Sequence, residues 1–166
     1  MKKGPLPYLI ALIAFLAAVM AITSYLLLVS LPPKVQPTAF ELNGKTYQIT
    51  AYALNTTEQE KGLMNATVTN MTFMIFSFGN AQIYPFWMKN TYSQLDIMWV
   101  DYNASSMSGR IVYWVNATPC DSYDHSQISC KIYAPSGIAN YVIETKAGFA
   151  EQNNLKIGDK IRFIYG

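Results

Sequence analysis

One stretch without charged residues near the N-terminus constrains this chain more than any other feature. Every residue from Leu6 to Leu31 is apolar, small or weakly polar, and a helix needs about 20 such residues to cross the hydrocarbon core of a bilayer. Lys2 and Lys3 precede the stretch, and Lys34 follows it. Because basic residues beside a membrane helix favour the cytoplasmic side, we predict a single-pass signal anchor in the lipid bilayer (residues 6–31) of the cell membrane, with a cytoplasmic N-terminus and an extracellular C-terminal domain.

Two alternatives exist for this N-terminus. A cleavable signal peptide usually has an apolar region of about 7 to 15 residues that ends in small residues, whereas Leu26–Val29 keep this stretch apolar to its end. A type IV pilin precursor is the second alternative, because Lys2-Lys3-Gly4 before an apolar segment resembles a prepilin peptidase site. Pro5 directly after that site favours the uncleaved anchor.

The sequence divides into three parts. Residues 1–31 are the cytoplasmic stub and anchor, residues 32–38 a Pro-rich spacer, and residues 39–166 one extracytoplasmic domain. Of the 12 basic residues, 12 − 2 = 10 follow Lys2 and Lys3, and they are matched by 10 acidic residues. A nearly neutral domain has no basic stripe for a phosphate backbone, so we expect no nucleic-acid partner.

The domain has the pattern of short strands. Asn43-Gly44 supplies the positive φ angles of a type I′ turn and predicts a hairpin over residues 40–52. Thr56 or Thr57 is expected to cap a short helix that reaches Met64, with Glu60 completing a capping box. Further strands are predicted at residues 72–78, 85–89, 95–101, 110–115, 141–145 and 161–165, with one helical turn at 150–154. The fold class is mainly β: a compact antiparallel sandwich or barrel-like domain with one or two short helices, preceded by one transmembrane helix.

The two cysteines, Cys120 and Cys130, lie in a segment rich in turn-forming residues. Outside the cell a disulfide between them is the default expectation. A metal pair with His125, the single histidine, is the alternative, but it leaves a zinc site one ligand short. We therefore predict no metal and no cofactor.

Five Asn-X-Ser/Thr sequons also suggest a glycosylating cell surface, archaeal or eukaryotic, and the Lys-Gly start favours an archaeon. The candidate acceptors are Asn55, Asn65, Asn70, Asn103 and Asn116.

Several strings of residues together resemble one family, the domain of unknown function 192. They are Gly62-Leu63-Met64, Phe86-Trp87-Met88-Lys89-Asn90-Thr91, Leu95-Asp96-Ile97, Pro119-Cys120, Cys130 with Tyr133, Tyr141-Val142-Ile143-Glu144 and Ala147-Gly148. The resemblance extends from Phe40 to the C-terminus and implies a compact, mostly β domain that is often exported or membrane-anchored. It implies no reaction or ligand. The chain departs from the family in having Lys61 where an arginine is usual, and in lacking a proline near Ser93 and Gln94.

Four polar residues stand in otherwise apolar strands and are candidates for a polar pocket: Lys89, Asn90, Asp96 and Glu144. We favour a structural Lys–carboxylate pair with Asn90 closing a turn, because buried ion pairs are common structural devices. The methionines Met64, Met71, Met74, Met88 and Met98, with Trp87, Trp99 and Trp114, suggest a soft metal site only weakly, because such side chains more often fill a core.

No nucleotide or hydrolase motif is found in the sequence. The first hypothesis is therefore a non-enzymatic envelope module that binds a protein or surface glycan through an apolar patch or groove. The alternatives are an enzyme or small-ligand-binding protein that uses the Lys/Asn/Asp/Glu pocket, and a pilin-like filament subunit.

Overall fold

The computed structural model of the chain describes residues 6–29, 35–120 and 130–166, and the chain forms two compact units that divide after Val35. The first unit contains one helix, α1 (Leu6–Val29), which carries no charged residue. The side chains described along it, from Leu9 to Ser24, are exposed. Among the described residues, no helix is both long enough and apolar enough to cross a membrane.

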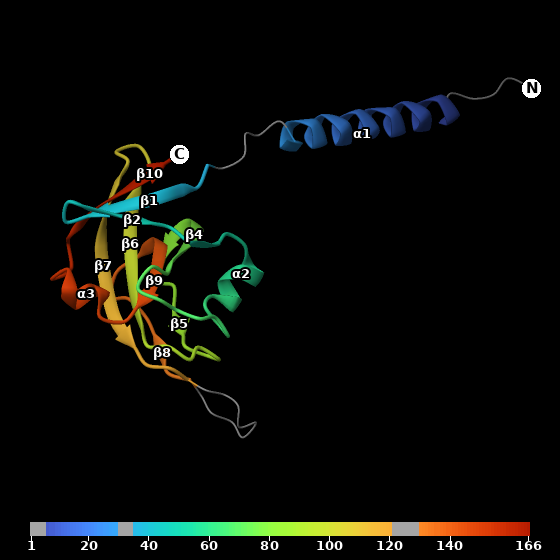
Figure 1. Ribbon diagram of the computed structural model, residues 1–166. Coiled ribbons are helices and arrows are strands. Elements are labelled where there is room, and N and C mark those ends of the chain that lie inside the picture. Colours follow the sequence, from blue (N-terminus) through green and yellow to red (C-terminus); the bar gives the residue numbers. More distant parts are fainter. Residues whose placement is uncertain (1–5, 30–34, 121–129) are drawn as a thin grey trace, which may run out of the picture. The chain divides into compact units, whose positions relative to one another are not determined.

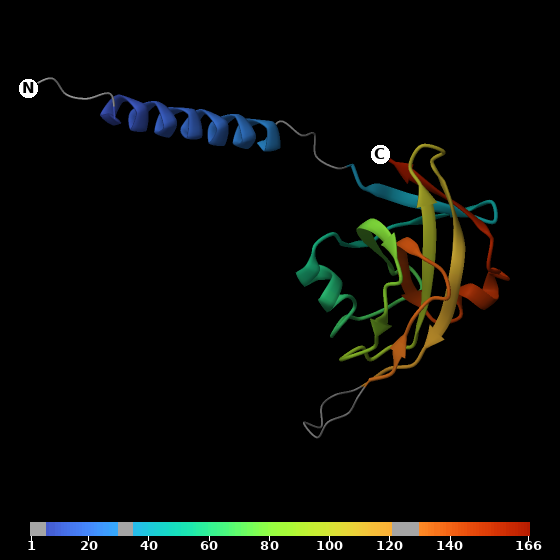
Figure 2. The ribbon, with the colours of Figure 1, turned by 180° about the vertical axis from the view of Figure 1, so that it is seen from behind.

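The second unit, Gln36–Gly166, is built around one eight-stranded sheet (Figures 1 and 2). The strand order is β2-β1-β10-β7-β6-β9-β4-β3. The strands of this sheet are β1 (Pro37–Leu42), β2 (Lys45–Gln48), β3 (Ala51–Ala53), β4 (Phe73–Gln82), β6 (Leu95–Asn103), β7 (Ser108–Ala117), β9 (Ala139–Lys146) and β10 (Lys160–Tyr165). A separate ribbon joins β5 (Phe86–Trp87) to β8 (Ile132–Tyr133), and the short helices α2 (Thr56–Lys61) and α3 (Phe149–Gln152) lie on opposite flanks of the domain.

The two edge strands of the sheet belong to one continuous stretch of chain. β2 forms one edge and β3 the other, and only Ile49 and Thr50 separate them. At this junction the N–H of Ile49 donates to the carbonyl of Thr38 on β1, and the N–H of Thr50 donates to the carbonyl of Phe73 on β4, both at 2.9 Å. The sheet therefore curls back on itself, which gives a barrel-like form.

The central strands bury side chains on both faces, because successive residues of a strand point to opposite sides. One face contributes to a cluster that includes Phe73, Ile75, Met98 and Ile143. The other face contributes Met74, Phe76, Ile97, Trp99 and Val142, which pack against Leu63, Val68 and Met88 from segments outside the large sheet. The continuous apolar runs in β4 and β6 follow from this double burial.

The predicted hairpin is confirmed over residues 39–48, but it ends before Tyr52, which lies on β3 and pairs with β4. Asn43 and Gly44 have φ angles of 51° and 76° and join β1 to β2. These two positive φ values are what a type I′ turn requires.

The predicted start and end of the first short helix are wrong by one to three residues. Asn55, and neither Thr56 nor Thr57, is the N-cap: its side-chain oxygen accepts a hydrogen bond from the N–H of Glu58 at 3.0 Å. The carboxylate of Glu58, and not that of Glu60, reaches back past the start of the helix and accepts from the N–H of Leu54, the residue before the cap, at 2.7 Å. Asparagine is at least as good an N-cap as threonine. The helix can therefore begin one or two residues earlier than predicted.

The sheet is mostly antiparallel, as predicted, with one exception. β3 pairs with β4 in parallel, with Ala51 opposite Met74. A parallel pair needs a crossover connection, and the chain supplies one through α2 between these strands. The sequence showed the helix but not the parallel pairing, because pairing partners are chosen by contacts distant in the chain.

The predicted disulfide is present. Cys120 and Cys130 are bonded, with their Cα atoms 5.7 Å apart. His125, considered as a metal ligand beside these cysteines, lies outside the described residues.

Candidate functional site

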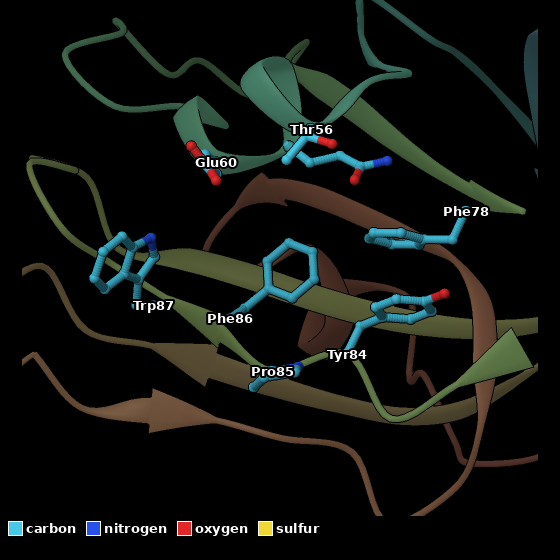
Figure 3. A pocket seen from close by; sticks show the side chains of 8 residues that line it. Thr56, Glu60, Phe78, Tyr84, Pro85, Phe86 and Trp87 are labelled. Atoms are coloured by element: carbon cyan, nitrogen blue, oxygen red, sulfur yellow. The ribbon is translucent and has the colours of Figure 1, made fainter. Parts of the chain in front are cut away.

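A cleft of about 220 Å³ opens between α2 and the segment that leads into β5 (Figure 3). One side is formed by Phe78, Tyr84, Pro85, Phe86 and Trp87, and the other by Thr56, Gln59 and Glu60 of α2. Figure 3 shows Thr56 and Glu60 facing the aromatic rings across the opening. Aromatic carbon opposite a few hydroxyl, amide and carboxylate groups is the usual lining of a small-molecule site.

The aromatic wall of the cleft is held in place by its own contacts. The rings of Phe78 and Tyr84 stack with their centroids 3.7 Å apart, and the indole N–H of Trp99 donates to the carbonyl of Tyr84 at 2.8 Å. Phe86 meets Phe76 and Trp99 edge to face, at 4.9 and 5.6 Å between centroids. The wall is therefore preformed, which lowers the ordering cost of binding.

Trp87 is the most accessible aromatic ring of this wall, with 43% of its surface exposed. The Nζ atom of Lys89 lies 5.2 Å from the centroid of the Trp87 ring, a cation–π contact that helps to fix the orientation of the indole. A large exposed aromatic ring beside a cleft is available for a ligand to stack against.

A smaller cavity of about 20 Å³, which has room for about one water molecule, adjoins the cleft. The two share Gln59, Glu60, Phe86 and Trp87 in their linings, and the smaller one also contacts Glu144 of β9. The cleft therefore has a carboxyl group at its inner end.

Glu144 is almost completely buried, with 4% of its surface exposed. Burial raises the pKa of its carboxyl from 4.5 to about 8, and a hydrogen bond from the backbone N–H of Leu63 offsets part of this increase. Its neighbours across the sheet are Met74 on β4 and Ile97 on β6. Within the described part of the chain, the Oε2 atom has no hydrogen-bond partner. Near neutral pH Glu144 is therefore mostly a neutral acid that can donate a hydrogen bond.

The approach of Leu63 to Glu144 depends on the glycine before it. Gly62 ends α2 with a φ of 48°, a conformation that side chains with a Cβ rarely adopt. A Cβ at this position would lie 3.3 Å from the Phe76 ring and 3.4 Å from Oε2 of Glu144. Glycine thus lets the loop pass close to the buried carboxyl.

Three strings of residues that carry the family resemblance meet at this inner cavity, although they are far apart in the sequence. Its lining includes Gly62, Leu63, Met64, Phe86, Trp87, Thr91 and Glu144. The first three residues follow α2, the next three belong to the Phe86–Thr91 string, and the last lies on β9. The resemblance therefore concentrates on the inner end of the cleft.

The structure does not bring the four predicted polar residues into one pocket. Asp96 faces Thr145 while the next residue, Ile97, faces Glu144, so the two carboxyls point to opposite faces of the sheet. Asp96 accepts hydrogen bonds at 2.8 Å from the amide of Asn116 and from the N–H of Ala150. Its role is to connect β6, β7 and α3.

Lys89 and Asn90 help to hold the segment after β5. The backbone of Lys89 forms an isolated β-bridge with that of Cys120. The N–H of Asn90 donates to the carbonyl of Cys120 at 3.0 Å, and its carbonyl accepts from the N–H of Asn65 at 2.8 Å. Neither residue lines the cleft or its inner cavity.

The aromatic wall of the cleft was not predicted from the sequence. The available signal was Tyr84-Pro85-Phe86-Trp87, since tyrosine, tryptophan and proline are less often fully buried than aliphatic residues. The sequence could not show that Phe78 and α2 form the other sides of this cleft.

The methionines do not gather at one place. Met74, Met88 and Met98 are buried in the two apolar clusters, while Met71 is 72% exposed. Over the described residues there is no group of three or more His, Cys, Asp or Glu side chains placed to hold a metal ion.

All five candidate glycosylation residues are exposed: Asn55, Asn65, Asn70, Asn103 and Asn116. Some also have structural roles, since Asn55 caps α2 and Asn116 binds Asp96. Their occupancy stays a prediction.

Two larger hollows, of about 590 and 480 Å³, lie along the β6–β7 turn and β10. Neither is lined by the strings that carry the family resemblance. The cleft beside α2 is therefore the better candidate.

These features define a curled, mostly antiparallel β domain with an aromatic cleft and a buried carboxyl at its inner end. The chain belongs to the DUF192 family, described as "Uncharacterized ACR", whose family model matches residues 38–163. The resemblance predicted from the sequence is thereby confirmed.

Solved structures that are similar to this chain include the following two. A protein of unknown function from Novosphingobium aromaticivorans is 25% identical with a TM-score of 0.60, over 77% of this chain and 84% of the other. A protein from Sinorhizobium meliloti, provisionally described as a transcription regulator, is 26% identical with a TM-score of 0.61, over 80% of this chain and 97% of the other. No functionally curated protein gives a significant match.

Proposed function

We propose that this protein is a membrane-anchored extracytoplasmic binding module whose cleft beside α2 holds one neutral sugar unit of a surface glycan. The observation that carries the proposal is the convergence of three distant strings of the family resemblance on the inner end of an aromatic cleft. Residues far apart in the sequence also meet in a buried core, but this place is a cleft open to solvent and it has an exposed tryptophan.

The two walls of the cleft suit a pyranose ring. Such a ring has a C–H face that stacks on aromatic rings and a rim of hydroxyls that hydrogen-bond to polar side chains. Trp87 and Phe86 offer the first kind of surface, and Thr56, Gln59 and Glu60 offer the second. A volume of about 220 Å³ lies just below the range of about 300 to 1,000 Å³ for larger ligands, which favours a single ring.

The charges at the cleft are few and mixed in sign. Glu60 is the one acidic residue among the residues that line the cleft, and no basic residue is among them. Two cations lie nearby, Lys61 in the adjoining cavity and Lys89 beside Trp87. Because no charge of one sign dominates, the cleft suits a neutral ligand.

Membrane anchoring is the second part of the proposal, and its support is the sequence. The charge-free stretch from Leu6 to Leu31 is longer than the about 20 residues that a span needs. It continues at both ends beyond Leu9–Ser24, the part of α1 with described side chains. Lys2 and Lys3 favour an inside N-terminus.

The binding proposal is tested on the fragment of residues 36–166. This fragment is one compact unit with its own core, and a domain of this kind makes up 97% of the Sinorhizobium chain. Titration with methyl glucoside, methyl galactoside, methyl mannoside and N-acetylglucosamine is followed by tryptophan fluorescence and calorimetry. We expect saturable binding of at least one sugar with a Kd of roughly 1 mM.

Trp87→Ala should weaken this binding at least about tenfold, because it removes the exposed stacking surface. Tyr92→Ala is the matched control: Tyr92 is also exposed but lines neither cavity, and its loss should leave the Kd unchanged. Absence of saturable binding to all four sugars would refute the proposal.

The anchor is tested separately on the full chain. It should remain in the membrane pellet after an alkaline carbonate wash, whereas a secreted 36–166 fragment should be released. Release of the full chain by carbonate would remove the anchoring part of the proposal and leave the binding part standing.

A further inference from the structure

We infer that Glu144 determines the specificity of the cleft: its neutral carboxyl donates a hydrogen bond from Oε2 to an oxygen atom of the bound sugar, directly or through one water, so that binding requires one proton. This inference rests on the proposed sugar-binding function. The inference specifies what the inner end of the cleft binds: an oxygen atom of a neutral molecule that accepts the hydrogen bond from Glu144.

The geometry at the inner end supports this role. Oε2 of Glu144 is buried and has no hydrogen-bond partner among the described residues, and the residue lines the cavity of about 20 Å³. An unpaired polar atom in a protein interior is costly, by about 1 to 3 kcal/mol in general. A ligand oxygen or a water in that cavity would satisfy it.

The surroundings of Glu144 keep it a donor. Its neighbours on β4 and β6 are Met74 and Ile97, and the side chains that line the cavity from the β5 segment are uncharged. The ionisable groups in the same cavity are Glu60 and Lys61, both at the end of α2 and both exposed. Burial then raises the pKa of Glu144 to about 8.

The state of this carboxyl selects among ligands. A neutral acid donates to hydroxyl, acetal or carbonyl oxygens, whereas an ionised one would prefer an ammonium group. Above pH 8 the donor is lost, and the affinity for a neutral sugar falls by up to tenfold per pH unit until the remaining contacts alone determine it. By linkage, the bound sugar must raise the pKa of Glu144, and this rise corresponds to the same free energy as the loss of affinity.

The experiment measures the Kd of the tightest-binding sugar of the panel, for the 36–166 fragment, from pH 6 to pH 9.5. For the wild type we expect a constant Kd below pH 7 and a loss of about tenfold by pH 9.5. Glu144→Gln keeps the shape and a donor, so its Kd should stay constant over the whole range. Glu60→Gln and Lys61→Gln, which change the other two ionisable groups of the cavity, should retain the alkaline loss.

A second readout does not depend on any variant. The ¹³C resonance of the Glu144 carboxyl should titrate at a higher pH when the fragment is saturated with the sugar. Equal pH profiles for the wild type and Glu144→Gln, or a titration unmoved by the sugar, would overturn the inference while the proposed binding function stands. If no sugar of the panel binds, the proposed function and this inference both fail.

Discussion

Two buried carboxyl groups on adjacent strands of this domain differ in their hydrogen bonding. Asp96 receives hydrogen bonds from Asn116 and from the backbone of Ala150, whereas Glu144 has an unpaired Oε2 among the described residues. The first arrangement connects Asp96 to two other elements, and the second, with its burial, favours a neutral acid at Glu144. Similar residues one row apart therefore serve different purposes, one structural and one available to a ligand.

The raised pKa of Glu144 predicts that this group makes the fold less stable as pH rises. The folded-state pKa of about 8 lies above the ordinary 4.5, so the folded domain binds more protons than the unfolded chain between these values. Its contribution is fully present below about pH 4.5 and is lost as pH rises to about 8, with a slope of up to about 1.4 kcal/mol per pH unit. Urea unfolding of the 36–166 fragment from pH 5 to 9 measures this slope.

Glu144→Gln should remove that slope and should be more stable than the wild type near pH 8. The matched control is Glu60→Gln, because Glu60 is exposed and lines the same cavity. An unchanged slope in Glu144→Gln would show that another group causes the dependence.

Gly62→Ala should destabilise the domain by more than Gly44→Ala, although both glycines have positive φ angles, at 48° and 76°. Of these two positions, only Gly62 has other atoms within 4 Å of where an added Cβ would lie, namely atoms of Phe76 and Glu144. We expect about 1 kcal/mol of loss for Gly44→Ala from the backbone alone, and about 2 to 3 kcal/mol for Gly62→Ala. Chemical unfolding measures the free energy of unfolding of both variants. Equal decreases would show that the loop at Gly62 accommodates the added Cβ at no cost in stability.

At the scale of elements, α2 is the weakest part of the candidate site. It spans Thr56–Lys61 and buries no residue of its own. Its attachment includes the Asn55 cap, a hydrogen bond of 3.1 Å from the Gln59 amide to the carbonyl of Ser77 on β4, and the approach of Gly62. Because α2 forms the polar wall of the cleft, its local stability affects binding directly.

Asn55→Ala should open α2 locally. Loss of an N-cap costs about 1 kcal/mol, which corresponds to roughly fivefold faster hydrogen exchange at the N–H of Gly62, the donor to the carbonyl of Glu58. Thr57→Ala is the control, since Thr57 is one of the two caps predicted from the sequence, with Thr56 as the other, and the structure uses neither. Faster exchange in Thr57→Ala than in Asn55→Ala would contradict the observed cap.

At the scale of the whole molecule, the domain closes its own sheet. The edge strands β2 and β3 are consecutive in the chain. The compact unit begins at Gln36, and the fold of the Sinorhizobium protein is matched over 97% of that chain. These observations indicate that the domain is stable by itself.

Removal of residues 1–35 should therefore leave the thermal stability of the domain unchanged. We expect the Tm of the 36–166 fragment to lie within about 2 °C of the Tm of the full chain in detergent, which corresponds to well under 1 kcal/mol. Scanning calorimetry with the disulfide intact measures both. A fall of more than about 5 °C would show that the first unit contributes to the folded domain.

Local features were predictable from the sequence because they depend on residues close together in the chain. The Asn43-Gly44 turn requires only two positive φ angles, the Cys120–Cys130 disulfide closes a short loop, and the mainly β class follows from the composition of short runs. The strings of residues that resemble the family, of which Phe86–Thr91 is the most specific, predicted the family, and the match over residues 38–163 confirms it.

The tertiary structure alone decided which side chains meet. It paired β3 with β4 in parallel, put Asp96 and Glu144 on opposite faces, and placed the loop at Gly62 against Glu144. These outcomes depend on register and on packing between segments up to about eighty residues apart, where a shift of one residue exchanges the two faces of a strand. For this reason the sequence predicted Glu144 only as one of four polar residues in apolar strands, and the fold alone showed that it lines a small cavity beside the aromatic cleft.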